Sequence, residues 1–275
     1  MVVATGLALA AAVLHAAWNL RVKRSTDRFL SLWGHHIAGG AFCLVLLALA
    51  GPPPLEVVPV LVASAVVHLC YVLTLVHAYD AGDFSLTYPI ARGGGAVLAA
   101  VGGWALLGDE LAAGSWVAIL LVTAGLATFV PTRSSWRPVA TAALVAATVA
   151  GYTLVDSAGT RQTAGISYPA TAFVGAAVLV SAWGTLRGRW PSFRAAWPHT
   201  WRSHMWAGPG SALAFTLVLT AVRYAPIGYV TALRESSVLL AAAVGAVVLR
   251  EPFGLARLRS AGIILAGLVL LVAVR

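Results

Sequence analysis

Three charged residues inside long apolar stretches are the first candidates for chemistry in this 275-residue sequence. Arg92 lies within the stretch 84–107, and Arg234 and Glu235 lie within the stretch 227–249. A charged side chain at the centre of a bilayer costs about 2.5–3.5 kcal/mol on insertion scales, so it persists mainly beside a cavity or a partner. The two arginines therefore suit a site that binds a carboxylate or a phosphate. The competing interpretation is structural, with each arginine joining helices through backbone carbonyl groups.

Aromatic and polar residues at helical spacing accompany these charges. Tyr88 precedes Arg92 by four residues, so both side chains share one helix face. His15, Trp18 and Asn19 have the spacing i, i+3 and i+4 and form a second stripe. Both sets are predicted to line a cavity and bind a small-molecule substrate. Trp18 and Asn19 equally suit the membrane interface beside the basic segment that follows them.

Two carboxylic acids are candidates for proton coupling. Neighbouring helix residues point about 100° apart, so Glu235 does not pair well with Arg234. Glu235 either carries a proton, because burial disfavours a charged carboxylate, or forms a static ion pair with Arg92 or with neighbours of Arg234. Tyr152 and Asp156 share a helix face, and Tyr152 is a further substrate-binding candidate. Asp156 lies near the predicted end of its helix, which favours a solvated position over a proton-carrying role.

No pattern in the sequence indicates catalysis or metal binding. His68 and His77 are nine residues apart and lie on opposite faces of one predicted helix, and His35 and His36 are adjacent. Neither spacing is that of a zinc site, and a Gly-x-Ser-x-Gly nucleophile motif is absent. The sequence therefore predicts a protein that is not an enzyme and has no cofactor and no metal.

The composition is that of a membrane protein. Hydrophobic residues make up 60% of the chain and charged residues only 10%, and the mean hydropathy is +0.88. Soluble domains carry about 25% charged residues, so lipid must surround most of this chain. The net charge of +9 comes from bases in short loops between apolar runs. The positive-inside rule explains this distribution better than nucleic-acid binding does, so no nucleic-acid partner is predicted.

The predicted fold is all-α and integral to the membrane, with ten transmembrane helices. Helix is the only economical conformation, because unpaired backbone groups are costly in lipid and no barrel pattern is present. The segment 187–203, rich in Trp, Pro and Arg, is predicted to be an interfacial connection, and Tyr168 an interfacial anchor. The predicted helices are 2–20, 30–50, 57–78, 84–107, 113–131, 138–157, 168–186, 204–223, 227–249 and 256–274.

An internal repeat divides the chain into two units, 1–134 and 135–275. Five helices in each unit place the second unit in the membrane with the opposite orientation, as in many secondary transporters. Chance matching of Ala, Val, Leu and Gly runs is the alternative, which two coincident arginines and two coincident acids make less attractive. A shift of 142 aligns Arg92 with Arg234, Leu107 with Leu249, Asp109 with Glu251, and Ala124-Gly125 with Ala266-Gly267, and a shift of 134 aligns Trp18-Asn19 with Tyr152-Thr153.

Several motifs resemble those of EamA-type proteins of the drug/metabolite transporter superfamily. They are LHAAWNL at 14–20, YPIARG at 88–93, LGDE at 107–110, LREP at 249–252 and RESS at 234–237. The resemblance covers the whole chain as two EamA units. It implies a ten-helix carrier that works by alternating access through a central cavity. Many relatives export amino acids, metabolites or drugs.

The predicted function is secondary transport, with export favoured, of small metabolites, amino acids, organic acids or drugs. Helices one, four, six and nine are expected to line the site. The alternative is a non-transporting membrane scaffold or a sensor subunit. A monomer is favoured over a homodimer, because ten helices already supply two pseudo-symmetric halves.

The basic residues predict an orientation in the plasma (inner) membrane. Apart from Arg92 and Arg234, the loops after odd-numbered helices carry 13 Lys and Arg, and the termini and the remaining loops carry three. The positive-inside rule then places both termini outside the cytoplasm, opposite to the orientation that the resemblance implies.

Overall fold

The computed structural model describes residues 1–23, 25–81, 84–128, 136–237 and 255–274, with side chains except those of 19–23, 84–86, 88–89 and 255–258. Within these residues the chain forms ten α-helices and one short 3-10 helix, and no strand. Three predictions fall on residues outside this description. They concern the side chains of Asn19 and Tyr88, the residues Leu249 and Glu251 that the repeat aligns with Leu107 and Asp109, and the second half of the predicted helix 227–249.

The helices form from the apolar stretches that the sequence predicts. The first four helical segments are α1 (Val2–Lys23), α2 (Arg28–Ala50), η1 (Leu55–Val57) with α3 (Val58–Ala81), and α4 (Phe84–Leu107). The next three are α5 (Ala113–Ala127), α6 (Trp136–Arg161) and α7 (Ser167–Leu186). The last are α8 (Trp190–Ala221), α9 (Ile227–Arg234) and α11 (Leu255–Ala273). Each begins within a few residues of its predicted start except α8.

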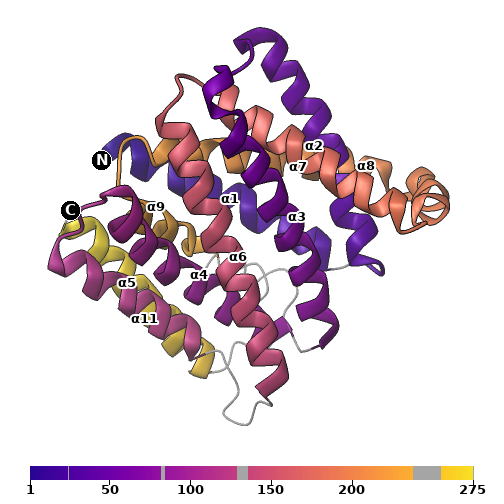
Figure 1. Cartoon of the computed structure of the whole chain (residues 1–275). Helices are drawn as coiled ribbons and strands as arrows, with labels where there is room; N and C mark the ends of the chain where they lie inside the picture. The colour runs from indigo at the N-terminus through magenta and orange to yellow at the C-terminus, as the bar shows by residue number, and fades with distance from the viewer. Residues whose placement is uncertain (24, 82–83, 129–135, 238–254, 275) are drawn as a thin grey trace.

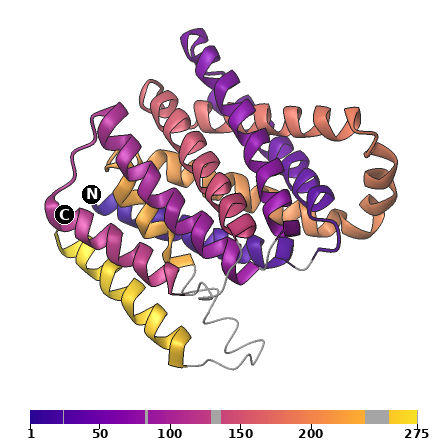
Figure 2. The same cartoon turned by 60° about the horizontal axis from the view of Figure 1, so that its bottom comes forward.

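The beginning of α8 corrects the prediction of an interfacial connection over 187–203. Helix α8 starts at Trp190 and includes Pro198 and Pro209 in its interior. A helix satisfies backbone polar groups that an irregular segment would leave unpaired near lipid, so the prolines bend the helix instead of ending it. Its first part runs in a different direction from the remainder (Figures 1 and 2). Trp190 and Trp201 remain exposed, as an interfacial position requires.

Lipid-facing surface and helix length identify a multi-pass membrane protein. In the described part of the chain, five helical spans are long and apolar enough to cross a bilayer: Arg28–Ala50, Leu55–Ala81, Ile90–Leu107, Trp136–Arg161 and Ser167–Leu186. Three shorter apolar helices, Val2–Trp18, Ala113–Ala127 and Arg259–Ala273, accompany them. Large apolar side chains are exposed on the outer faces, among them Leu49, Val62, Leu106 and Val178. Such a surface suits lipid and not water.

The antiparallel helices define two ends of the molecule. The terminal end contains Met1, the α4–α5 connection and the start of α9, and both termini lie close together there (Figures 1 and 2). The basic end contains the α1–α2 and α7–α8 connections, which carry many of the bases. Helices α5 and α11 pack side by side at one edge of the bundle (Figure 1).

Candidate functional site

A small cavity lies at the centre of the helix bundle. Its volume is about 90 Å³. Helices α1, α6 and α9 line it as predicted, together with α2, α3, α7 and α8, whereas no described side chain of α4 does. Aromatic and histidine side chains dominate the lining, which comprises Trp18, Tyr71, Tyr152, Phe173, Phe215, His15, His35, His36, His68, Leu32, Ser211, Ala214 and Arg234.

Arg92 and Glu235 form a buried ion pair next to this cavity. Arg92 Nη2 lies 2.8 Å from Glu235 Oε1, and Arg92 Nε donates a hydrogen bond to Oε2 at 3.1 Å. Their side chains are only 9% and 3% exposed. A two-point contact in a medium of low dielectric constant is strong, and each group neutralises the other. Arg92 thus binds a carboxylate of the protein itself, which is the static ion pair predicted as the alternative to proton coupling.

Arg234 faces the cavity, and its Nε has no hydrogen-bond partner among the described residues. Arg234 is the last residue of α9 and Glu235 is its C-cap, and the two side chains point in different directions, so the glutamate engages Arg92 while the arginine reaches the cavity. His15 of α1 lines the same cavity. Because Glu235 neutralises Arg92, the positive charge in the corner of the cavity between α1 and α9 comes from Arg234, and it suits an anionic group.

Asp156 and Tyr168 correct two predictions. Asp156 is fully buried and not solvated, because α6 continues to Arg161, beyond the predicted helix end at 157. Tyr168 is also fully buried, and its hydroxyl donates a hydrogen bond to Asp156 Oδ1 at 3.2 Å. Gly159 makes room for it, since a Cβ there would lie 2.1 Å from the Tyr168 ring. The tyrosine closes over the carboxyl group instead of anchoring the membrane surface.

His68 connects this buried carboxyl group to the cavity. Its Nδ1 lies 3.8 Å from Asp156 Oδ2, and its ring stacks on Tyr152 at 4.5 Å between centroids. Both His68 and Tyr152 line the cavity. The sequence suggested His68 only as a metal ligand, a role that its spacing from His77 excludes. A histidine in the middle of an apolar stretch with no metal spacing was the available signal for this role.

A polar network ties the terminal end together. Asp109, which follows α4, accepts a hydrogen bond from the backbone N–H of Ile227 at 2.6 Å and pairs with Arg161 at 2.7 Å. Gly108 has a φ of +68°, which allows the chain to turn sharply before the aspartate. The carboxylate therefore caps the positive N-terminal end of α9. Arg223 adds a bond from Nε to the carbonyl of Thr160 at 3.0 Å.

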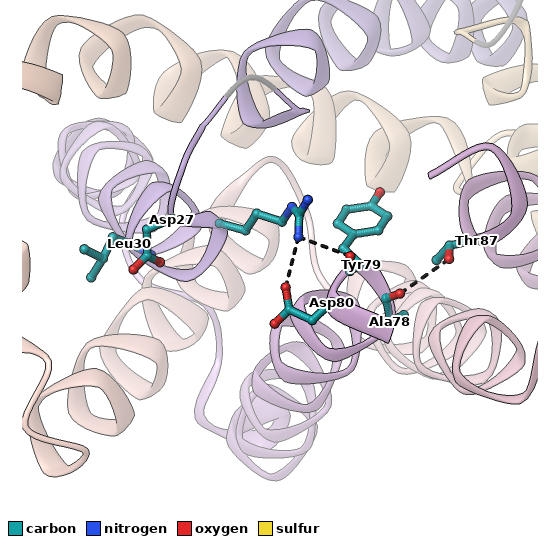
Figure 3. Close-up of polar contacts among 7 residues, drawn as sticks. Asp27, Leu30, Ala78, Tyr79, Asp80 and Thr87 are labelled. Atoms are coloured by element: carbon teal, nitrogen blue, oxygen red, sulfur yellow. Dashed lines mark hydrogen bonds and ion pairs between the residues drawn. The ribbon is translucent and has the colours of Figure 1, made fainter. Parts of the chain in front are cut away.

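The basic end is held by more exposed contacts. Arg28, at the start of α2, reaches across to α3, where it bonds the Tyr79 carbonyl at 3.1 Å and Asp80 Oδ1 at 2.9 Å (Figure 3). The Thr87 hydroxyl donates a hydrogen bond to the Ala78 carbonyl at 3.5 Å and so joins the start of α4 to the end of α3 (Figure 3). A second ion pair joins Asp27, the N-cap of α2, to Arg189.

The structure thus brings most of the predicted site residues into one region. His15, Trp18, Tyr152 and Arg234 line the same cavity. The Arg92–Glu235 pair lies beside it, and Asp156 lies behind His68. These residues come from α1, α3, α4, α6 and the end of α9.

Across the described residues, an all-helical bundle with a lipid-facing surface and an internal cavity lined by aromatic rings, histidines and one arginine defines a multi-pass membrane protein. The chain belongs to the EamA-like transporter family, whose sequence profile matches residues 136–273, about half of the 275 residues. The family is part of the drug/metabolite transporter superfamily, and its members are membrane transporters of small molecules and not enzymes.

A solved structure described as "Crystal structure of protein" has a similar fold. Its TM-score is 0.77, with 99% of both chains covered and 15% sequence identity. At this identity the likeness establishes the fold alone. No curated protein matches the chain.

Proposed function

We propose that this protein is a secondary transporter that moves a small organic anion through the central cavity by alternating access, in the export direction favoured by the family resemblance. One observation carries the proposal: Arg234 reaches a cavity otherwise lined by aromatic rings, histidines and small residues. Guanidinium groups bind carboxylates in two-point geometry, and aromatic walls bind planar apolar groups. The substrate class is therefore a small carboxylate with a planar or apolar body, such as an amino acid or organic acid.

An inverted repeat of two five-helix units, 1–134 and 135–275, is the proposed architecture. The packing of the helices supports it, because exchanging the two units maps one set of contacts onto another. The pair α1 and α8 corresponds to α6 and α3, and the pair α4 and α6 corresponds to α9 and α1. The α2–α7 and α5–α11 contacts map onto themselves. Rocking of such units about a midplane site is the usual route to alternating access.

Glu235 supplies the proposed coupling between protons and substrate. In this structure its carboxylate forms an ion pair with Arg92, so the guanidinium is not available to a substrate. A proton on Glu235 weakens that ion pair, and the freed guanidinium then joins Arg234 in binding the substrate carboxylate. Asp156 is a second proposed proton site, because His68 lies between its carboxyl group and the cavity. His15, Trp18 and Tyr152 shape the pocket in this mechanism, with Tyr88 and Asn19 as further predicted contacts.

Thermal unfolding of the purified protein against a panel of carboxylates and their uncharged amides tests the proposal. A ligand at 100 times its dissociation constant stabilises the folded state by about 2.7 kcal/mol. We expect stabilisation by carboxylates of one class, lost in Arg234→Gln and kept in Arg194→Gln, which alters an exposed arginine on α8. Folded protein that responds to no carboxylate would contradict the proposal and favour a scaffold or sensor subunit.

The proposed setting is the plasma membrane, with a monomeric chain and both termini outside the cytoplasm. The distribution of bases supports this orientation, because Arg161 and Arg223, two of the three bases on the terminal side, bond groups of the protein itself. A reporter that is active only in the cytoplasm, fused to the C-terminus, should be inactive. An active reporter would show that the C-terminus lies in the cytoplasm and would contradict the proposed orientation.

A further inference from the structure

A second cavity of about 250 Å³ lies at the basic end, between the α1–α2 connection and the first half of α8. Its polar lining consists mainly of the hydroxyl groups of Ser25, Thr26, Ser31, Thr200 and Ser203. Asp27 also lines it, but its carboxylate is paired with Arg189 and accepts the Leu30 N–H. The chamber is therefore suited to hydrogen bonding with a polar solute and not to binding by charge.

This basic-end chamber and the central cavity share a wall of aromatic and histidine rings. His204 lines the basic-end chamber, and His35 lines the central cavity. The centroids of these two rings are 5.2 Å apart, and Trp18 meets His35 edge-on at 6.3 Å on the cavity side. On the other side His204 stacks on Trp197 at 5.5 Å. The His35 and His204 rings therefore lie between the two spaces at this point.

Glycines leave the rings in direct contact with backbone at this wall. A Cβ at Gly34 would lie 2.5 Å from His204 Nε2, so the ring occupies the place of a side chain on α2. Farther along the same helix pair, a Cβ at Gly208 would lie 2.6 Å from the Gly39 backbone nitrogen. Helices α2 and α8 therefore pack backbone to backbone near Gly208, and the His204 ring fills the space between them at Gly34.

We propose that the two cavities are chambers of one passage, and that His35 and His204 form the gate between them. The basic-end chamber is the first binding site for the solute on that side and holds its polar groups through hydroxyl hydrogen bonds. When the two rings move apart, the solute passes to Arg234. The identity of the solute rests on the proposed function, whereas the passage and its gate do not.

Cysteine labelling tests the passage without a substrate. In a Cys70→Ser background, Ser203→Cys reports on the basic-end chamber and Ser211→Cys on the central cavity, since each serine lines its own space. Cys43 is buried and remains in place. The probe is a small, positively charged methanethiosulfonate added to protein in lipid nanodiscs. We expect rapid modification of Ser203→Cys and slow modification of Ser211→Cys.

Removing a gate ring should open the route to the inner cysteine. His204→Ala should accelerate the labelling of Ser211→Cys by about tenfold or more, the change produced when ~1.4 kcal/mol is removed from a barrier. His35→Ala should act in the same direction and provides a second test if His204→Ala does not fold. The matched control is His199→Ala, which removes an exposed imidazole from the same helix and should leave the rate unchanged.

Each outcome decides the proposal. Acceleration in either folded gate variant, with no change in the control, supports the gate. Unchanged labelling of Ser211→Cys in both folded gate variants, or no labelling of Ser203→Cys, overturns it. Because no solute is present, the labelling result stands even if no carboxylate proves to be a substrate, and a confirmed substrate does not rescue a failed labelling result.

Discussion

The terminal end and the basic end of this bundle are both fastened by acid–base pairs, but the two sets differ in burial. At the terminal end the Asp109 side chain is 6% exposed and bonds both Arg161 and the N-terminal backbone of α9. At the basic end the Asp80 side chain is 63% exposed and meets Arg28 in solvent. Buried pairs with additional hydrogen bonds resist separation, whereas exposed pairs contribute about 0–1 kcal/mol. The comparison indicates that the terminal end is the locked end in this structure.

The cavities agree with this difference. The larger chamber lies at the basic end, one ring pair away from the central cavity. At the terminal end, Asp109 links the end of α4 to the end of α6 and the start of α9. Helices α4 and α9 belong to opposite predicted repeats, so this network joins the two units. In the proposed alternating-access cycle, opening toward the terminal end breaks these bonds.

The largest expected effect is loss of the terminal lock. Asp109→Ala leaves Arg161 without its carboxylate partner, with only its bond to the Val222 carbonyl, and leaves the first N–H of α9 without its acceptor. We expect destabilisation of about 3 kcal/mol, the lower end of the range for broken buried pairs, because Arg161 is itself partly exposed. Chemical unfolding in detergent measures it. Glu110→Ala, at the exposed neighbouring acid, should have little effect, and equal destabilisation by both variants would remove the distinction between the ends.

Filling the gap beneath Tyr168 should have the next largest effect. In Gly159→Ala the new Cβ would collide with the tyrosine ring that covers Asp156. Overpacking of this kind destabilises by about 1–3 kcal/mol. Gly210→Ala is the matched control, since open space surrounds that helical glycine, and it should be neutral or stabilising by up to about 1 kcal/mol. Equal unfolding midpoints for both variants would refute the close packing of Tyr168.

Substitution at the basic end should change the free energy of unfolding least. Asp80→Ala removes the exposed pair with Arg28 and should change the free energy of unfolding by less than about 1 kcal/mol. Raising the salt concentration should shrink even this difference, because salt screens exposed charges. The same salt series should leave the effect of Asp109→Ala nearly unchanged. A loss at Asp80 as large as that at Asp109 would contradict the comparison.

The sequence predicted the positions of the helices well, because long apolar stretches between charged loops identify them without knowledge of packing. It failed at 187–203, where prolines suggested a connection but the membrane environment favours a bent helix. The burial of Asp156 was also missed. It depends on Tyr168, which folds back from the next helix, a tertiary contact with no local signature.

The candidate site was predictable in part. Arg234, His15 and Tyr152 stood out as polar or aromatic residues at helical spacing, and they do line one cavity. The partner of Arg92 was named as one possibility, but no sequence spacing selects a contact between residues 143 positions apart. The contributions of α2, α3, α7 and α8 were missed. Their histidines and aromatic residues look like ordinary core residues until neighbouring helices are placed around them.

The most direct test of the central claim is transport by protein reconstituted in liposomes, using the carboxylate that stabilises the protein most. Wild-type protein and Arg194→Gln should accumulate the labelled solute with saturable kinetics. Arg234→Gln, if it folds with the same thermal midpoint in the absence of ligand, should lose nearly all of this transport. Folded Arg234→Gln that transports the solute at the wild-type rate would contradict the assignment of the central cavity as the substrate site.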